Sequence, residues 1–341
     1  MKKKILHLVP AMNIGGVEIG IQNSYSHLNE IYDYRVFSIK GAGTLNIPLV
    51  ANRDFYPLFY KKNLRPDVIV SSLWPSHVIA YFLAQSGTPW IPFFHSAKEY
   101  SPIKRKIMQA ALNRGHSFLF DSNATRISMG VAVKDPRSHI CPYIFKTNVP
   151  ESQKPLKDRD FDFIYVGRIC EEKRIDLIRL FLSSLREYGI KFKVYLALAG
   201  TEEDFNLICS DFQRCGIEFL AERNLKHDYV IEKLRLSRFY ILLSDAEGFS
   251  MGTVEAVQNG CIPIVRPVGE IPVYLERSAA VWVEESSAEG IRIATAALSK
   301  IWNRWEVLER MQSLGTAKLV SITGYVDAFS NAISHCLATR P

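Results

Sequence analysis

The sequence predicts an α/β protein built from two doubly wound domains. The chain has 341 residues, which suits two domains better than a single core, and short apolar strands alternate with helices in two separate stretches. Between the stretches, residues 145–160 hold prolines and charges with few apolar side chains, as interdomain linkers do. We therefore expect an N-terminal domain over residues 1–150 and a C-terminal domain over 151–322. Residues 323–341 are expected to form a C-terminal helix that packs back on the N-terminal domain.

The first stretch contains near-continuous apolar runs separated by segments of helical spacing. Such runs indicate strands buried on both faces, which is typical of a parallel sheet covered by helices. Strands are predicted at residues 5–9, 35–39, 68–72, 90–94 and 118–120, and helices at 17–28, 76–84 and 103–112.

The alternation starts again after the linker. The residues at 177, 178, 181, 182 and 185 form one apolar helix face, which Gly189 ends. From about residue 288 only helices are predicted. Two such domains would face each other across a cleft, with ligands bound beyond the carboxyl ends of the strands. Strands are predicted at residues 163–166, 194–199, 239–243, 262–265 and 280–283.

The most informative motif covers residues 244–255, where a buried strand runs through a glycine-bearing turn into a helix. Glu247 lies on the turn and Glu255 lies in the helix, with seven residues between them. Helix-start amides bind phosphates, and carboxylates accept hydrogen bonds from hydroxyl groups. The motif therefore predicts a site for a sugar diphosphate, and the alternative is a capped helix with two surface glutamates. The predicted binding residues are Gly248, Phe249, Ser250, Met251, Gly252 and Glu255.

A second motif follows the first strand of the C-terminal domain. Gly167 ends the strand, and Arg168 and Lys173 come next. Arginine binds a diphosphate as a fork and lysine binds it as a point charge, so both are candidates to hold the same ligand. The alternative is that they pair with nearby acidic side chains on the surface, namely Glu171, Glu172 and Asp176.

The N-terminal domain offers two further candidates. Gly15-Gly16 follows its first strand, and a turn of this kind lets a ligand lie against the backbone. The spacing of a dinucleotide-binding fingerprint is absent there. His95 ends a strand on the expected cleft side, where it could contact a sugar hydroxyl or the reacting centre. The alternative for His95 is a satisfied core histidine.

Charge is divided unevenly along the chain. Residues 1–150 hold 18 Lys and Arg against 8 Asp and Glu, whereas the rest of the chain holds 24 against 27. A basic half favours an anionic partner. The basic helix over 101–114, with Lys61, Lys62 and Arg65, is predicted to contact anionic membrane lipid, unless it is an ordinary solvated helix face. No nucleic-acid-binding module is recognised.

Several other features are predicted to be absent. No segment is apolar enough to cross a membrane. A cytoplasmic protein is expected, with the inner face of the membrane as its alternative location. Asp158 and Asp160 form a D-x-D pattern, but it precedes a strand, so we interpret it as solvated charge. Because Arg168, Lys173 and the helix amides supply positive charge, no metal and no cofactor are predicted.

These motifs together resemble retaining glycosyltransferases, specifically glycosyltransferase family 4. The resemblance rests on residues 244–256 and 260–265, on Gly167-Arg168 with Lys173, on the turn at 15–18 and on the segments 121–125 and 268–272. It implies a GT-B fold of two Rossmann-like domains, with the donor held by the C-terminal one and the acceptor by the N-terminal one. It also implies that Glu255 binds the donor ribose and that Glu247 lies beside the donor sugar. The catalytic assignments are Glu247, Arg168, Lys173 and His95.

The sequence departs from the family pattern at several positions. Ser250 stands where glycine is usual and Gly252 where a larger residue is usual, while residues 201–204 replace a glycine-rich segment. These departures leave open how the nucleotide base is recognised. A segment that begins at Tyr143 replaces an Asn-Gly pair of the family, so the residues that contact the acceptor are open too.

The expected function is metal-independent transfer of a sugar from a nucleoside diphosphate sugar to a hydroxyl, with retention at the anomeric carbon. The acceptor is expected to be a glycan or lipid-linked glycan in surface-polysaccharide biosynthesis. Two alternatives remain at this point: a sugar-nucleotide epimerase of similar fold, and a non-catalytic nucleotide-sugar-binding subunit.

Overall fold

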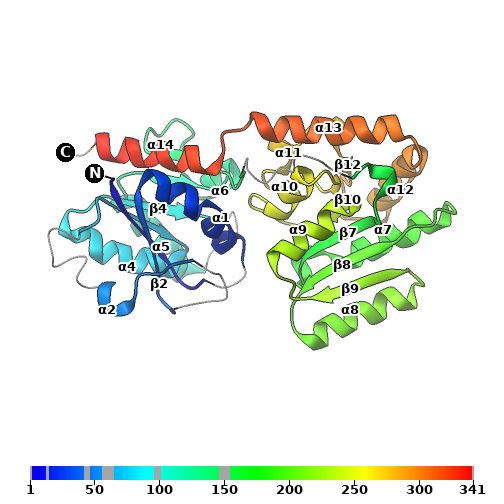
Figure 1. Cartoon of the computed structure of the whole chain (residues 1–341), viewed down its shortest axis with the longest axis horizontal. Helices are drawn as coiled ribbons and strands as arrows, with labels where there is room; N and C mark the ends of the chain where they lie inside the picture. Colours follow the sequence, from blue (N-terminus) through cyan, green and yellow to red (C-terminus); the bar gives the residue numbers. More distant parts are fainter. Residues whose placement is uncertain are drawn as a thin grey trace. The chain divides into compact units, whose positions relative to one another are not determined.

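The computed structural model describes residues 2–12, 15–41, 47–55, 65–95, 101–145 and 154–339. The chain forms two compact units (Figure 1). Unit 1 comprises Met1–Phe145 with Thr323–Pro341, and unit 2 comprises Lys146–Ile322. Each unit holds a six-stranded sheet with helices around it. The predicted α/β class with two doubly wound parts is confirmed.

The sheet of unit 1 has the order β2-β1-β3-β4-β5-β6, and all of its pairings are parallel. Every residue of β3, β4 and β5 is buried, as expected for strands covered on both faces. β6 was not predicted, because it is short and only partly buried. The strands are β1 (Lys4–Val9), β2 (Asp33–Ser38), β3 (Val68–Ser72), β4 (Trp90–Phe94), β5 (Phe118–Phe120) and β6 (Ser138–Ile140).

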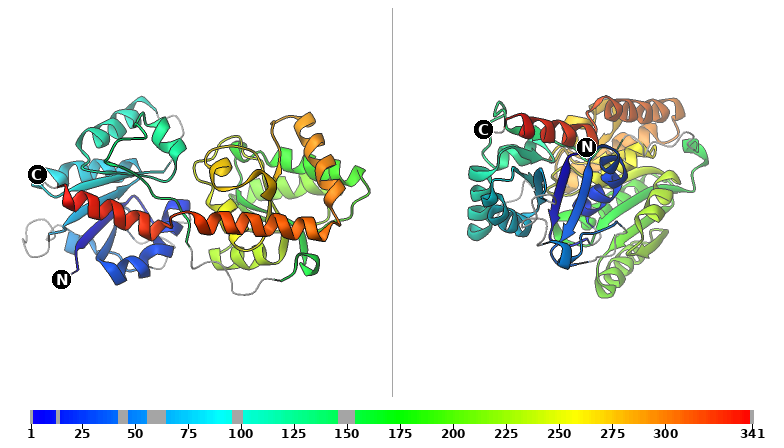
Figure 2. Two further views of the ribbon diagram at one scale, coloured as in Figure 1. Left: turned by 90° about the horizontal axis from the view of Figure 1, so that it is seen from above. Right: turned by 60° about the vertical axis from the view of Figure 1, so that its left-hand side comes forward.

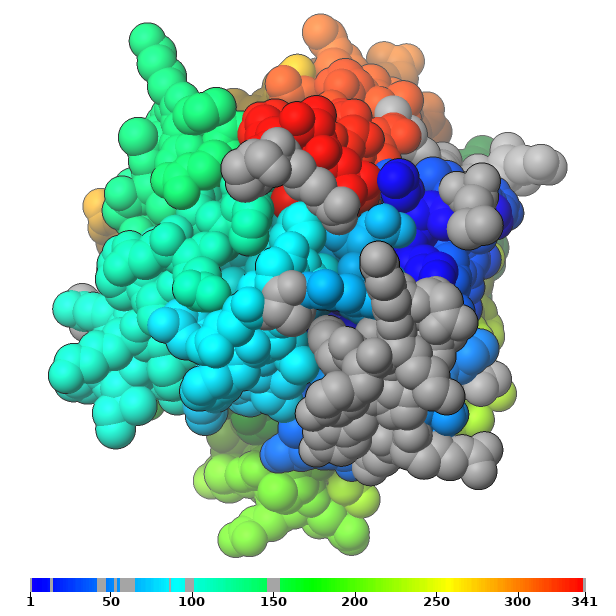
Figure 3. All heavy atoms as spheres, turned by 90° about the vertical axis from the view of Figure 1, so that its left-hand side faces the viewer, coloured from blue at the N-terminus to red at the C-terminus, as the bar shows by residue number. Residues whose placement is uncertain are grey.

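The helices of unit 1 include one from the far end of the sequence. α14 contacts α1, β5 and β6, and the Tyr325 N–H donates to the Ile144 carbonyl at 3.0 Å. Figures 2 and 3 show α14, in red, between the blue N-terminal segments and green segments of this unit. The helices are α1 (Gly16–Ile31), α2 (Asn52–Phe55), α4 (Trp74–Leu83), the 3₁₀ helix η1 (Ala84–Ser86), α5 (Pro102–Arg114), α6 (Asn123–Ser128) and α14 (Tyr325–Ala338).

The sheet of unit 2 has the order β12-β11-β10-β7-β8-β9 and is also parallel. All six residues of β10 are buried, whereas β9 lies at an edge and is largely exposed. That exposure explains why β9 was not predicted from apolar runs. The strands are β7 (Phe161–Arg168), β8 (Val194–Ala199), β9 (Phe219–Arg223), β10 (Ser237–Leu242), β11 (Ile262–Val265) and β12 (Val281–Trp282).

The helices of unit 2 bury apolar faces against this sheet. In α7 six apolar side chains are buried, each worth about 1.5–3 kcal/mol when fully removed from water. Gly189 follows with φ +72°, a conformation suited to glycine after a helix end. The helices are α7 (Ile175–Glu187), α8 (Glu202–Arg214), α9 (His227–Arg235), α10 (Met251–Gln258), α11 (Ile271–Tyr274), α12 (Ala288–Ile301) and α13 (Trp305–Ser321), with 3₁₀ helices η3 (Leu156–Asp158), η4 (Glu171–Lys173) and η5 (Arg277–Ala279).

Candidate functional site

The strand order of unit 2 reverses between β7 and β10. The chain passes from β7 to β8 and β9 on one side, whereas β10 lies on the other side of β7 and leads to β11 and β12. Ligands of open α/β sheets bind beyond the carboxyl ends of the strands at such a reversal. The segments that follow β7 and β10, residues 169–174 and 243–250, lie at this point and contain the predicted donor motif.

Lys173 and Glu247 meet at this reversal. The Lys173 Nζ lies 2.6 Å from Glu247 Oε1, although the two residues are 74 positions apart. Their side chains are only 17% and 10% exposed. The sheet explains the contact, because β7 and β10 are parallel neighbours and their carboxyl ends lie side by side. The structure therefore brings together a cation and a carboxylate that the sequence had assigned to one site.

A network around Asp245 holds the two segments together. The Asp245 carboxylate accepts hydrogen bonds from Arg174 at 3.1 Å, from Arg266 at 2.5 Å and from Ser286 at 3.0 Å. Its backbone N–H donates to the Glu172 carbonyl at 2.9 Å. Burial opposes ionisation of Asp245, but the bonds from Arg174 and Ser286 and the charges of Arg174 and Arg266 lower its pKa. Sequence analysis missed this network, because its members come from four separate segments.

The turn before α10 rests on the loop that follows β11. Gly269 has φ +58°, and a Cβ built there would lie 2.3 Å from the Glu247 carbonyl oxygen and 2.4 Å from that of Gly248. The Glu270 N–H donates to the Gly248 carbonyl at 3.0 Å. Only glycine fits this position, so Gly269 fixes the backbone that carries Glu247.

Ser250 is the N-cap residue of α10, and its backbone is left-handed, with φ 60° and ψ 69°. Its hydroxyl lies 2.9 Å from the Thr253 hydroxyl and makes no capping bond to the helix amides. Phe249 is buried and packs on Tyr274 with ring centroids 5.2 Å apart. Met251 begins the helix. The start of α10 is thus a positive dipole end without a side-chain cap.

The start of α8, unlike that of α10, has a side-chain cap and acidic residues. Thr201 caps it by accepting from the Asp204 N–H at 3.1 Å, and its first turn is acidic, with Glu202, Glu203 and Asp204. A phosphate would meet negative charge there. Of these two helix starts, α10 is the one suited to an anion.

Two of the predicted glycines are required by packing. A Cβ on Gly252 would lie 2.6 Å from the Tyr240 hydroxyl, and one on Gly167 would lie 2.5 Å from the Tyr165 hydroxyl. These contacts add a structural reason for glycine beside the predicted phosphate approach. Arg168 follows Gly167, is exposed, and makes no side-chain hydrogen bond or ion pair to any residue in the described ranges.

Glu255 has a partner that sequence analysis did not predict. Its Oε1 lies 2.7 Å from His227 Nε2, with the side chains 13% and 17% exposed. Burial alone would lower the pKa of His227, but the hydrogen bond and charge of Glu255, with the charge of Asp228, raise it. The sequence had predicted no role for His227. A spacing of 28 residues gave no signal for this pair.

The glycine turn of unit 1 is partly described. Gly15 is the N-cap of α1 in an extended conformation, and Gly16 is the first helical residue. A Cβ on Gly15 would lie 2.5 Å from Glu18 Oε2. Burial raises the pKa of Glu18. Asn13 and Ile14, which complete the predicted loop, lie outside the described residues.

His95 follows β4 in unit 1, and both of its ring nitrogens have partners. Nε2 lies 2.9 Å from the Ser72 hydroxyl, and Nδ1 lies 2.7 Å from the Tyr143 hydroxyl. His7 Nε2 contacts the same Ser72 oxygen at 2.7 Å. Burial, with smaller effects of neighbouring histidines, lowers the pKa of His95 well below its ordinary value. A hydrogen bond from His95 to a substrate would have to replace one of these bonds.

Comparison with known proteins places this geometry in context. Residues 149–318 match the model of the family described as Glycosyl transferases group 1. The Staphylococcus aureus protein named capsular polysaccharide biosynthesis glycosyltransferase CapH is 23% identical over 322 residues, covering 81% of this chain and 85% of that protein. Anabaena HepE, solved with UDP-glucose, has a TM-score of 0.75 at 13% identity, covering 97% of this chain and 98% of HepE. A glycosyltransferase from Rickettsia africae has a TM-score of 0.77 at 14% identity, covering 100% of both chains.

The chain has the GT-B fold. The family match and the capsular relative also support a glycosyltransferase. The matched residues 149–318 all fall within unit 2, the part of the GT-B chain that holds Lys173, Glu247 and Glu255.

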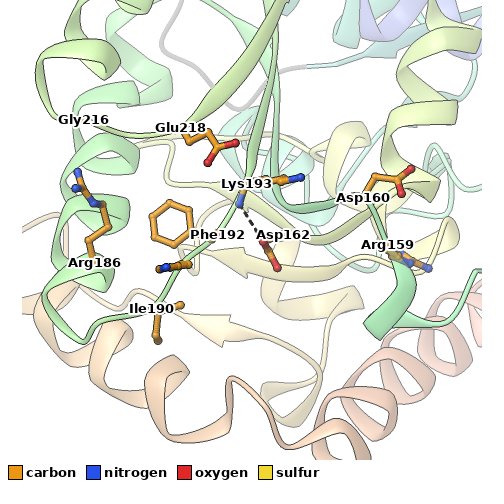
Figure 4. A pocket seen from close by; sticks show the side chains of 10 residues that line it. Arg159, Asp160, Asp162, Arg186, Ile190, Phe192, Lys193, Gly216 and Glu218 are labelled. Carbon is orange, nitrogen blue, oxygen red and sulfur yellow. Dashed lines mark hydrogen bonds between the residues drawn. The ribbon is translucent and has the colours of Figure 1, made fainter.

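A hollow of about 540 Å³ lies at the other end of the unit 2 sheet, where β7 and β8 begin (Figure 4). Its walls carry charged side chains of both signs, and several of them already have partners. Asp162 accepts from the Lys193 N–H at 2.9 Å and from Arg238 at 2.7 Å, and Asp160 pairs with Lys154 at 2.7 Å. We therefore do not assign the donor to this hollow. Among the described residues, no cluster of three or more His, Cys, Asp or Glu is placed to hold a metal ion.

The basic helix of the GT-B chain is α5 in unit 1. Lys104, Arg105 and Lys106 are exposed, as predicted, and Lys104 lies 5.8 Å from the ring centroid of the half-exposed Trp74. Ile103 is 74% exposed although it is apolar. The buried face instead carries Met108, Ala111 and Leu112. Lys61 and Lys62 lie outside the described residues, and no described helix is long and apolar enough to cross a membrane.

Proposed function

We propose that the protein is a retaining glycosyltransferase of family 4, which moves a sugar from a nucleoside diphosphate sugar to a hydroxyl group of a glycan or lipid-linked glycan. The contact between Lys173 and Glu247 carries this proposal. Their side-chain atoms lie 2.6 Å apart beyond the carboxyl ends of β7 and β10. An ammonium group suits a diphosphate, and a carboxylate beside it suits the hydroxyls of the attached sugar.

The proposed chemistry is electrostatic stabilisation of the leaving diphosphate. Lys173 would exchange Glu247 for a phosphate oxygen, and the exposed Arg168 would approach from the end of β7. The uncapped start of α10 would add its dipole. Negative charge grows on the diphosphate as the sugar departs, so these groups act most strongly in the transition state. Glu247 would then orient the sugar and its developing positive charge.

Two features of unit 1 are also proposed to bind ligands. His95 would exchange one of its present partners, Ser72 or Tyr143, for a hydroxyl near the reacting centre. Gly15 and Gly16 would leave the start of α1 open to the ligand.

The reaction is proposed to need no metal ion, because Lys173, Arg168 and the helix amides provide the positive charge. Turnover should therefore be unchanged by an excess of EDTA. A loss that added Mg²⁺ or Mn²⁺ restores would contradict this part of the proposal.

Surface-polysaccharide assembly is the proposed setting. The capsular relative and the solved HepE complex with UDP-glucose support a sugar-nucleotide donor and a polysaccharide product. Lys104, Arg105 and Lys106 on α5 would bind anionic lipid, each contributing about 1 kcal/mol. In flotation with liposomes, the protein should bind acidic vesicles and not neutral ones. Equal binding to both would argue against membrane contact through α5.

Thermal-shift screening with UDP- and GDP-sugars, followed by turnover, tests the function. We expect one donor to raise the melting temperature, and Glu247→Ala to lower turnover about 100-fold because the sugar is misplaced. Glu289→Ala, on the exposed surface of α12, is the control. Unchanged turnover in Glu247→Ala would contradict its role. Donor conversion without an acceptor would indicate an epimerase, and binding without turnover would indicate a non-catalytic subunit.

A further inference from the structure

His227 and Glu255 join α9 to α10 beside the proposed donor site. His227 is the first residue of α9, and its Nε2 lies 2.7 Å from Glu255 Oε1. Both side chains are largely buried, at 17% and 13% exposure. The two residues are not neighbours in sequence, because they are 28 positions apart and the whole of β10 lies between them.

The contact uses only half of the carboxylate. Glu255 Oε1 is bonded to His227, whereas Oε2 makes no hydrogen bond to any residue in the described ranges. A carboxylate has two acceptor oxygens, so one stays available to a hydroxyl group while the other is held. Because a bond on one oxygen also restricts rotation of the side chain, the direction of the second oxygen is fixed.

The helices have another connection that does not involve this carboxylate. Arg235, at the end of α9, donates through Nε to Asn259 Oδ1 at 2.9 Å, just beyond α10. The Asn259 amide in turn donates to the Glu255 backbone carbonyl at 2.8 Å. Arg235 therefore offers a matched comparison, because it joins the same two helices without contacting the Glu255 side chain.

We propose that His227 is a positioning residue of the donor site, which holds Glu255 so that its second oxygen accepts a hydrogen bond from the ribose of the nucleotide. This inference rests on the proposed function. It adds a residue of α9 to a site otherwise formed by the segments after β7 and β10. The raised pKa of His227 agrees with this arrangement, since a charged imidazole binds a carboxylate more strongly than a neutral one.

The experiment compares UDP and GDP with their 2′,3′-dideoxy analogues, which lack the ribose hydroxyls. The melting temperatures of the wild type, His227→Ala, His227→Gln and Arg235→Ala are compared first. Binding by each of these proteins is then measured by calorimetry. We expect His227→Ala to weaken binding of the ribonucleotide about tenfold, or about 1.4 kcal/mol, and to leave binding of the dideoxy analogue unchanged. Glutamine retains a donor of similar reach, so His227→Gln should recover most of the affinity, and Arg235→Ala should keep all of it.

Three results would overturn the inference. The first is wild-type binding by His227→Ala, and the second is an equal loss by that variant for the ribonucleotide and its dideoxy analogue. The third is the same loss in Arg235→Ala, which would indicate loosened helix packing. The variant Glu255→Ala distinguishes failure of the inference from failure of the proposed function. If it weakens ribonucleotide binding while His227→Ala does not, only the inference fails. If the wild type binds neither UDP nor GDP, the proposed function fails, and the inference fails with it.

Discussion

Ser250 holds a left-handed backbone at the point where α10 begins. This conformation costs a non-glycine residue about 1–2 kcal/mol, and the resemblance to family 4 marks the position as one where glycine is usual. The serine hydroxyl, in return, lies 2.9 Å from that of Thr253. Residue 250 therefore combines backbone strain with a local side-chain bond beside the proposed phosphate site.

This balance gives a prediction for two substitutions. Ser250→Ala loses the hydroxyl contact but keeps the strain, so its free energy of unfolding should fall by about 1 kcal/mol. Ser250→Gly loses the same contact but relieves the strain, so it should be more stable than Ser250→Ala by about 1 kcal/mol. Denaturant unfolding of both variants measures the difference. If Ser250→Ala is as stable as Ser250→Gly, the left-handed backbone at residue 250 does not lower the free energy of unfolding.

Individual contacts in the site differ in how far sequence can predict them. Lys173 and Glu247 each follow a buried strand, and neighbouring parallel strands bring their carboxyl ends together, so their proximity was predictable. The pairing of His227 with Glu255 was not, because α9 and α10 meet at an angle and register that no short-range pattern encodes. The Asp245 network was missed for the same reason.

At the scale of elements, the loop after β11 supports the turn before α10. Gly269 allows the carbonyl oxygens of Glu247 and Gly248 to approach its α-carbon, where a methyl group would lie within 2.4 Å of both. This support links β11 to the carboxylate that is proposed to orient the donor sugar.

Two alanine substitutions test that support. Gly269 and Gly189 both have positive φ, but a Cβ on Gly189 meets nothing within 4 Å. Gly189→Ala should therefore cost only the backbone strain, about 1 kcal/mol. Gly269→Ala should cost about 1–3 kcal/mol more, and it alone should weaken donor binding, since it displaces the turn. Equal losses of stability with unchanged donor binding in both variants would show that the loop does not position Glu247.

Strand prediction succeeded where both faces are buried and failed at two of the four edge strands. β3, β4 and β10 are wholly buried and read as continuous apolar runs. β6 and β9 lie at sheet edges, where β6 is short and only partly buried and β9 is largely exposed. In α5 the helix itself was predicted, but the face it buries does not follow from polarity alone, because the apolar Ile103 faces solvent.

At the scale of the whole molecule, the folded chain buries neutral histidines. Burial lowers the pKa values of His7 and His77 in unit 1 to about 3 each. In the unfolded chain a histidine has a pKa of about 6.5, so between these values the unfolded chain binds protons that the folded unit excludes. The free energy of unfolding should therefore fall as the pH drops below about 6.5, by about 1.4 kcal/mol per pH unit for each histidine.

His77→Phe tests this linkage. Phenylalanine keeps a ring beside Trp90 and Phe94 but cannot bind a proton. Denaturant unfolding at about pH 7 and about pH 5 should show a pH slope reduced by about 1.4 kcal/mol per unit relative to the wild type. If the slope is the same in both proteins, His77 is protonated in the folded state or does not contribute to the linkage.

Charge also differs along the whole chain. The first 150 residues carry the excess of basic side chains, while the rest of the chain, which includes the proposed donor site, carries a slight excess of acidic ones. The positive charge at the donor site is therefore local. It comes from Lys173, from Arg168 and from the helix dipole at the start of α10, all near the ends of β7 and β10. The donor site depends on this local arrangement and not on net charge.

A crystal structure of the protein with the nucleoside diphosphate that stabilises it most tests the central claim directly. The account predicts diphosphate oxygens about 2.7–2.9 Å from Lys173 Nζ and at the first amides of α10, with a ribose hydroxyl on Glu255. A nucleotide bound elsewhere, with Lys173 still paired to Glu247, would contradict it.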